Sequence, residues 1–239
     1  MGACGARERR RTSVLLETVV LACVALTLAL VLKTFFVQAF YIPSESMEPG
    51  LVENDRILVQ KTSYWFGGEP KRGDVVVFED PGSWLGPGDN DEPGAVGQIL
   101  GKIGLYPTGG HLVKRVVGIA GDTIVCCDES GRISVNGQPI NENDYVNDAD
   151  TVVCRGPQVR TCEWAAGPVP EGHVFVMGDN RERSADSSAH MCTPTVTDCT
   201  ENPYVPVANI VGKVFVLLWP SSRFDWVTRP DTFAEVPAQ

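Results

Sequence analysis

The stretch His111-Leu-Val-Lys-Arg-Val-Val-Gly118 is a short apolar run that two adjacent cations, Lys114 and Arg115, interrupt. Valine-rich runs of this length that end at glycine predict a β-strand. Neighbouring residues of a strand face opposite sides of the sheet, so we expect one of the two cations to face the interior. A buried lysine loses its proton readily because burial disfavours the charge, and it can then act as a general base near neutral pH. The alternative is an edge strand whose charges lie in solvent.

Similar short runs continue on both sides of this stretch and favour a mainly β body. Asn136-Gly137 is a strong signal for a tight hairpin turn. No stretch of helical length with a 3.6-residue period follows residue 50. Polar stretches rich in glycine and proline, at 81–99 and 141–170, are predicted to be surface loops or insertions. We expect an antiparallel β domain with a smaller inserted β region. The other predicted strands are 56–61, 74–78, 123–127, 132–135, 174–177 and 211–218.

The N-terminal segment predicts a transmembrane helix. Val14–Leu32 is apolar apart from Glu17 and a few threonines. As a helix it would be about 28 Å long at about 1.5 Å per residue, close to the hydrocarbon thickness of a bilayer. Arg9-Arg10-Arg11 precedes it, so the positive-inside rule puts the N-terminus in the cytoplasm and the body outside the cell membrane. The alternative is a cleaved secretory signal, but its apolar region would be shorter and a small-x-small site would follow.

The charge of the chain is unevenly spread. The formal net charge is −10. The first 40 residues carry five basic and two acidic side chains, whereas the rest of the chain carries 15 basic and 28 acidic ones. An acidic body argues against nucleic acid as a partner, because phosphates require a basic patch. The pattern suits a soluble domain that a short basic segment holds near membrane lipid.

Six of the eight cysteines lie in the β body. An even number with short spacings is typical of disulfides in an oxidising compartment. The adjacent Cys126 and Cys127 are not expected to bond each other, because that geometry is strained, and the spacing leaves the pairing open. A zinc site with His190 is the alternative, but the C-x-x-C spacing of such sites is absent. The six cysteines are Cys126, Cys127, Cys154, Cys162, Cys192 and Cys199.

Two further segments are dense in groups that can carry chemistry. Tyr41-Ile-Pro-Ser-Glu-Ser-Met-Glu-Pro-Gly50 holds Ser44 and Ser46 between two prolines. Met177-Gly-Asp-Asn-Arg-Glu-Arg-Ser-Ala-Asp-Ser187 follows a predicted strand and is rich in hydrogen-bonding side chains. Taken singly, each segment is explained as an ordinary polar turn, since serine, aspartate and asparagine favour turns.

In this order, and after an apolar N-terminal segment, the three segments resemble the sequence boxes of the bacterial type I signal peptidases. Ile42-Pro-Ser-Glu-Ser-Met47 is similar to the nucleophile box, Val113-Lys-Arg-Val-Val-Gly118 to the lysine box and Gly178-Asp-Asn-Arg to the final box. The resemblance runs from about residue 14 to residue 220. The arginine-rich N-terminus and the acidic, cysteine-bearing loops resemble members from high-GC Gram-positive bacteria, the actinobacteria.

Carried over to the matching positions, the resemblance implies a serine endopeptidase with a serine–lysine dyad. Ser46 would be the nucleophile and Lys114 the general base. The backbone N–H of Ser46 and the hydroxyl of Ser44 would form the oxyanion hole. Ser184 would form a hydrogen bond with Lys114 and orient it. The other supporting polar residues would be Arg115, Asp179 and Asp186, and the substrate pocket would be lined by Ile42, Met47 and Val113.

The resemblance also implies substrates and a division of the chain. The substrates would be secretory preproteins with small residues at positions −1 and −3 of the signal peptide, bound as an added strand at a sheet edge. No metal or organic cofactor is implied. The chain would consist of a cytoplasmic N-terminus, a transmembrane anchor, an extracytoplasmic β catalytic core in two pieces and an inserted β subdomain. Their residues would be 1–13, 14–32, 33–118 with 173–239, and 119–172.

Two positions depart from the family pattern. Ser188 stands where an arginine commonly follows Asp-Ser, and Arg183 and His190 are candidates to replace that arginine. Glu45 lies between the two serines, where small residues are frequent.

Two other function classes remain as alternatives. A self-cleaving repressor-type Ser/Lys protease would carry a DNA-binding N-terminal domain and no anchor. A catalytically inactive, membrane-tethered β module would keep its function in Ser46→Ala and Lys114→Met, because a fold does not guarantee a chemistry.

Overall fold

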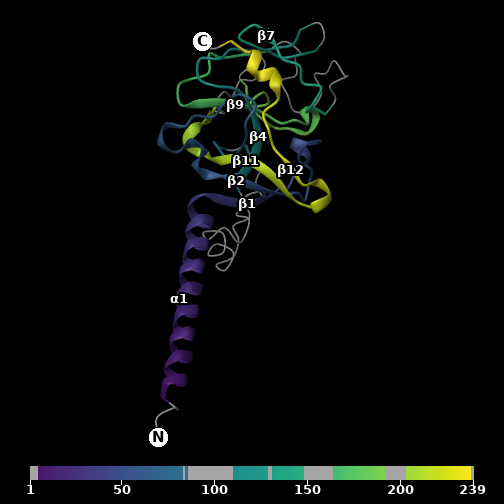
Figure 1. The fold of residues 1–239 in the computed structure, drawn as a ribbon. Coiled ribbons are helices and arrows are strands. Elements are labelled where there is room, and N and C mark those ends of the chain that lie inside the picture. The colour runs from purple at the N-terminus through teal and green to yellow at the C-terminus, as the bar shows by residue number, and fades with distance from the viewer. Residues whose placement is uncertain are drawn as a thin grey trace.

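A long helix leads into a β body in the computed structural model of the chain (Figure 1). The structure describes residues 5–82, 84–85, 110–128, 131–147, 164–191 and 203–237. The helix α1, Gly5–Phe35, is 31 residues long and extends beyond the predicted segment 14–32 at both ends. Side chains 14–30 are exposed, and α1 projects away from the body (Figure 1). Among the residues described, no helix combines the length and the apolarity needed to cross a bilayer, so the transmembrane anchor stays a prediction.

The main sheet of the body is antiparallel throughout and has eight strands. Its order is β1-β2-β11-β3-β4-β9-β10, and β12 pairs with β11. Because β4 lies between β3 and β9, the alternative of an edge strand at Lys114 is wrong. The strands are β1 (Val37–Tyr41), β2 (Arg56–Gln60), β3 (Val75–Glu79), β4 (His111–Gly118), β9 (His173–Met177), β10 (Val205–Pro206), β11 (Ile210–Trp219) and β12 (Asp225–Trp226).

A second sheet of four short strands has the order β7-β6-β5-β8. Asn136 and Gly137 join β6 to β7 with φ values of 53° and 79°. Both angles are positive, as a two-residue hairpin turn of the primed type requires, so the predicted turn is confirmed. The strands are β5 (Ile124–Cys126), β6 (Ser134–Val135), β7 (Gln138–Pro139) and β8 (Trp164–Ala166). All four lie within 119–172, although those bounds as a domain division stay a prediction.

Short 3₁₀ turns connect the strands. The turn η1 follows β1 and carries Ser46, one of the candidate site residues. The turns are η1 (Glu45–Met47), η2 (Lys61–Gly67), η3 (Arg181–Arg183), η4 (Val207–Asn209), η5 (Ser221–Arg223) and η6 (Asp231–Glu235).

The apolar core lies on both sides of the main sheet, because β3 and β4 are buried on both faces. Val76 and Val116 pack with Phe78 in one cluster. Val75, Val77 and Val113 pack in another, together with Ile42 and Met47 of the nucleophile segment. A third cluster joins the small sheet to β9. The valine-rich sequence of the central strands therefore reflects burial on two faces rather than one.

Two sequence expectations need correction. The stretch 141–170, predicted to be surface loops, contains strand β8 and the buried side chains of Glu142 and Tyr145. Cys126 and Cys127, not expected to bond each other, are joined in a disulfide. Because β5 ends at Cys126, the alternation that separates neighbouring strand residues no longer holds at this pair. Cys154, Cys162, Cys192 and Cys199 lie outside the described residues, as does most of 81–99.

Candidate active site

Strand β4 and the turn η1 bring two buried polar side chains together. Lys114 Nζ lies 2.6 Å from Ser46 Oγ and is hydrogen-bonded to it. Lys114 is 3% exposed and Ser46 is 5% exposed. The two residues are 68 positions apart in the sequence. Their contact therefore arises from the tertiary fold, which places η1 over the side of β4 that Lys114 faces.

Burial controls the protonation of Lys114. Desolvation lowers the pKa of Lys114 to about 8, while the charges of Asp186 and Asp179 act in the opposite direction. No carboxylate in the described part of the chain lies within ion-pair distance of this amine. An amine in such surroundings is neutral in a large fraction of molecules near pH 8, and it can then accept a proton from a neighbouring hydroxyl.

Ser44 places a second hydroxyl beside the first. Its Oγ lies 3.2 Å from Ser46 Oγ. Ser44 precedes η1 in extended conformation, with φ −142° and ψ 159°. The carbonyl of Ser46 accepts a hydrogen bond of 3.1 Å from the backbone N–H of Asn180, which fixes η1 against the loop after β9. The arrangement can present a hydroxyl donor next to an attacking oxygen, as oxyanion stabilisation requires.

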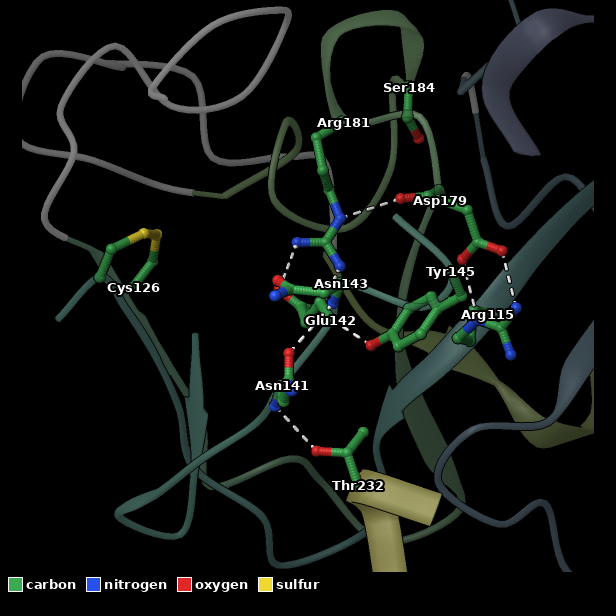
Figure 2. A network of polar contacts seen from close by, with 12 residues as sticks. Arg115, Cys126, Asn141, Glu142, Asn143, Tyr145, Asp179, Arg181, Ser184 and Thr232 are labelled. Atoms are coloured by element: carbon green, nitrogen blue, oxygen red, sulfur yellow. Dashed lines mark hydrogen bonds and ion pairs between the residues drawn. A yellow bond between two sulfur atoms is a disulfide. The ribbon is translucent and has the colours of Figure 1, made fainter. Parts of the chain in front are cut away.

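Arg115 faces the opposite side of β4, and each of its three guanidinium nitrogens donates a hydrogen bond. Its guanidinium forms two parallel hydrogen bonds of 2.8 and 2.7 Å to the carboxylate of Asp179 and a third, of 3.0 Å, to the carbonyl of Gly73. The ring of Tyr145 lies beneath it at 4.5 Å (Figure 2). Burial acts against the charge, but Asp179 outweighs it, so the pKa of Arg115 is raised. The sequence predicted that one of the two cations faces the interior, whereas both are buried.

Asp186 accepts hydrogen bonds from several residues of the final box, and one of its donors is Ser184, which was expected to contact Lys114. The hydroxyl of Ser184 donates to Asp186 at 2.6 Å. No hydrogen bond from Ser184 to Lys114 is formed in the described structure, so that expected contact is wrong. A carboxylate is the stronger acceptor, and a serine two residues away reaches it directly. The backbone N–H of Gly178 also donates to Asp186, at 2.9 Å.

Ser188 takes the place of the arginine that the family pattern contains. Its hydroxyl donates to Asp186 at 2.7 Å and its backbone N–H donates at 3.0 Å. The two candidate substitutes do not fill this role. Arg183 pairs with Glu45 at 3.0 Å, and His190 stacks on Trp84 with its Nδ1 at 2.8 Å from the backbone oxygen of Asp186.

Three further residues near the site were not predicted from the sequence. Glu142 and Arg181 form a buried ion pair, and the hydroxyl of Tyr145 donates to Glu142 at 2.9 Å (Figure 2). Glu142 and Tyr145 lie in a stretch whose polarity predicts a loop, and no local pattern distinguishes them. Arg181 belongs to the final box, but its partner is 39 residues away in the sequence.

A cleft of about 320 Å³ opens beside Ser46 and Lys114. The three predicted pocket residues, Ile42, Met47 and Val113, all line it. The cleft lies between β1, which is the first strand in the sheet order, and the start of β4, whose pairing with β9 begins only at Arg115. The other lining residues are Phe40, Tyr41, Pro43, Ser44, Leu85, Gly110, His111 and Leu112.

Comparisons with known proteins identify the family to which the chain belongs. A family model described as signal peptidase, peptidase S26, matches residues 15–219. The signal peptidase I of Mycobacterium tuberculosis is 41% identical over 231 residues, which cover 90% of this chain and 76% of the relative. The probable signal peptidase I of Mycobacterium leprae is 37% identical, with coverage of 94% and 83%. The signal peptidase I of Leptolyngbya laminosa is 32% identical, with coverage of 95% and 91%.

Proposed function

Since this chain belongs to the signal peptidase family, peptidase S26, and is therefore a serine peptidase, we propose that it cleaves signal peptides from secreted preproteins at the membrane, with Ser46 as nucleophile and Lys114 as general base. The observation that carries the proposal is the 2.6 Å contact between Lys114 Nζ and Ser46 Oγ in surroundings that lower the lysine pKa to about 8. Lysine can replace histidine as the base of a serine nucleophile where it is neutral.

The proposed reaction has two halves. In the first, the neutral amine of Lys114 takes the proton of Ser46 as Oγ attacks the scissile carbonyl, and then gives that proton to the leaving amine. In the second, Lys114 takes a proton from a water molecule as that water attacks the acyl-enzyme ester. Lys114 then returns the proton to Ser46 Oγ as the ester bond breaks, and the signal peptide leaves with a free carboxylate. The backbone N–H of Ser46 and the hydroxyl of Ser44 stabilise the oxyanion in both halves. A donor of this kind contributes about 3–4 kcal/mol to transition-state stabilisation.

The cleft supports an extended peptide as substrate. The peptide would lie between β1 and the start of β4 and pair with their backbones, as added strands do. Ile42, Met47 and Val113 line the cleft next to the dyad. We propose that these apolar side chains leave room only for small side chains at −1 and −3, because a bulky residue would be rejected by steric clash.

The helix α1 supports a position at the membrane. Its side chains from 14 to 30 are exposed, and many of them are leucine or valine. Three arginines precede them in the sequence. We propose that α1 holds the chain in the cell membrane by a single pass, with the N-terminus in the cytoplasm and the β body outside. Protease added to intact cells should then degrade an epitope on the body and spare one at the N-terminus. The reverse pattern, or release of the full chain at alkaline pH, would contradict this topology.

The decisive experiment uses the full chain, purified in detergent, and a preprotein with an Ala-x-Ala site. Wild-type protein and a matched lysine control, Lys71→Ala, should cleave after the second alanine, as N-terminal sequencing of the product would show. Ser46→Ala and Lys114→Ala should abolish cleavage while circular dichroism shows a retained fold. A bulky residue at −1 should block cleavage by the wild type. Cleavage that survives in either dyad variant would refute the assignment of Ser46 and Lys114.

A further inference from the structure

Residues 142–147 connect the inserted region to two loops of the site, one after the turn η1 and one after β9. We call these residues the strap. Val146 bridges to Pro49, which follows the nucleophile turn η1. Asn147 bridges to Asn180, and its N–H donates to the carbonyl of Asp179 at 3.0 Å. The strap therefore contacts the segment after Ser46 and the segment after β9, which the hydrogen bond from Asn180 to Ser46 already joins.

The first side-chain connection from the strap runs through Glu142. Its carboxylate accepts hydrogen bonds from both terminal nitrogens of Arg181, at 2.5 and 3.1 Å. Arg181 Nε in turn donates to the carbonyl of Gly178 at 3.0 Å. Gly178 is packed so closely that a β-carbon there would collide with Ser184 and with the carbonyl of Ser46. Holding Gly178 in place therefore also holds the backbone of Ser46.

The second connection runs through Tyr145 to the strand that carries the base. The tyrosine hydroxyl donates to Glu142 at 2.9 Å, and its ring lies 4.5 Å beneath the guanidinium of Arg115. A cation over an aromatic ring is attracted to it, and the attraction strengthens when both groups are desolvated. Arg115 directly follows Lys114 on β4, so fixing Arg115 fixes the backbone from which Lys114 projects toward Ser46.

We propose that Glu142 and Tyr145 are positioning residues of the serine–lysine reaction: through Arg181 and Arg115 they hold Ser46 and Lys114 at their reacting distance. The proposal rests on the proposed function of Ser46 and Lys114. Neither strap residue lines the cleft, so neither contacts the substrate. The inserted region is then part of the catalytic apparatus rather than an appendage to it.

The chemistry of the Glu142–Arg181 ion pair favours a role in placing the reacting groups over a role in stabilising the fold. A buried ion pair loses hydration, and it contributes little to stability compared with apolar side chains of the same volume. It does impose one fixed arrangement on the groups that it joins, since the guanidinium fork matches the carboxylate in one plane. Reactions between two side chains are sensitive to such placement, because a displacement of about 1 Å can reduce the rate about 100-fold.

The test compares strap variants with a variant that destabilises the inserted region elsewhere. Ile133→Val removes one methyl group from the core beside the small sheet and leaves the strap contacts intact. Glu142→Gln keeps the volume and removes the charge, Tyr145→Leu removes the ring beneath Arg115, and Tyr145→Phe keeps that ring and removes only the hydroxyl. Steady-state cleavage of the preprotein by the full chain in detergent gives kcat and KM, each corrected for the folded fraction.

We expect Glu142→Gln and Tyr145→Leu to lower kcat at least about 30-fold with KM changed less than about threefold, because the loss lies in placement of the reacting groups. Tyr145→Phe should retain more activity than Tyr145→Leu, with a loss below about tenfold. Ile133→Val should keep the wild-type kcat. The proposal is overturned if Glu142→Gln or Tyr145→Leu keeps the wild-type kcat, if the loss lies in KM, or if Ile133→Val loses as much as they do.

A double variant tests the route through Arg181. If Glu142 acts by holding Arg181, Glu142→Gln combined with Arg181→Gln should have the same kcat as Arg181→Gln alone, because the second change removes a contact already lost. Multiplicative losses would show that Glu142 acts independently of Arg181 and would contradict the route. Ser46→Ala separates a failure of the proposed function from a failure of the positioning role of the strap. Cleavage by Ser46→Ala overturns the proposed function itself, whereas an inactive Ser46→Ala beside a fully active Glu142→Gln overturns only the role of the strap.

Discussion

The surroundings on the two sides of strand β4 shift the pKa values of two adjacent cations, Lys114 and Arg115, in opposite directions. Lys114 and Arg115 are 3% and 6% exposed, so burial is nearly equal. On one side, Lys114 contacts a hydroxyl, and burial lowers its pKa. On the other side, Arg115 meets Asp179, Gly73 and Tyr145, and its pKa is raised despite burial. The difference lies in the partners that each side supplies.

This contrast shows how one strand can serve both chemistry and structure. Strand alternation sends neighbouring side chains in opposite directions, so a single dipeptide can place an uncharged base on one side and a permanent charge on the other. Arginine keeps its proton under all ordinary conditions, whereas lysine gives it up when buried. The order Lys-Arg therefore matters, and exchanging the two residues would remove the proposed base while leaving the net charge unchanged.

The largest expected effect comes from Lys114→Met. The substitution keeps the shape of the side chain and removes the amine, so preprotein cleavage should fall at least about 1,000-fold. Stability to urea should stay the same or rise, because a desolvated amine is removed. The measurement is kcat/KM together with a urea titration. A clear loss of stability would mean that Lys114 is held for structure, and the contrast between the two sides of β4 would fail.

Arg115→Met, in contrast to Lys114→Met, should clearly lower the stability of the protein. It leaves Asp179 buried without its partner, and breaking a buried pair in this way costs about 3–5 kcal/mol of stability. Urea unfolding measures the loss. Arg132→Met is the matched control, because Arg132 pairs with Asp128 at a largely exposed site, where the expected loss is below about 1 kcal/mol. Equal losses at the two arginines would show that burial does not set the strength of the Arg115 pair.

Ser188→Ala tests the support of Asp186, whose charge acts to raise the pKa of Lys114. Its hydroxyl is one of the donors to Asp186, and a hydrogen bond to a charged group contributes about 1.5–3 kcal/mol. We expect a stability loss in that range, measured by thermal and urea unfolding, with cleavage changed only a few-fold. A loss of cleavage comparable to that of Lys114→Met would assign Ser188 to the reaction and contradict its role as a support for Asp186.

Glu45→Gln should have the smallest effect. Glu45 pairs with Arg183, but the two side chains are 46% and 66% exposed. Exposed pairs contribute at most about 1 kcal/mol and are weakened by salt. Stability and cleavage should therefore both stay close to the wild type at 0.5 M NaCl. A large salt-resistant loss would give this departure from the family pattern a role that its exposure does not explain.

The sequence predicted best where local pattern and tertiary structure agree. The valine-rich runs predicted β2, β3, β4, β9 and β11 of the main sheet but not β1, β10 or β12, and Asn136-Gly137 predicted the turn that the structure contains. The contact between Ser46 and Lys114 could not be derived from spacing, since it joins residues far apart in the chain; only the ordered resemblance to a family suggested it. The roles of both residues stay proposals.

The misses have more than one physical cause, and the first is that some partners come from distant segments. Glu142 and Tyr145 are buried because Arg181 and Arg115 satisfy them, and no pattern within 141–170 encodes those partners. Ser184 was expected to contact Lys114, but Asp186, only two residues away, accepts its hydrogen bond. Short β8 fell within a predicted loop because its three residues are too few to show alternation.

The most direct test of the account is the protonation of the Lys114 amine itself. Full-length protein labelled with ¹³C at lysine Cε, with the Lys114 signal assigned by its loss in Lys114→Met, can be titrated by NMR in detergent. The account predicts a pKa of about 8, well below the ordinary 10.5. Cleavage should rise through the same pH, because the neutral form is the active one. Titration near 10.5, or cleavage that falls as the amine loses its proton, would contradict it.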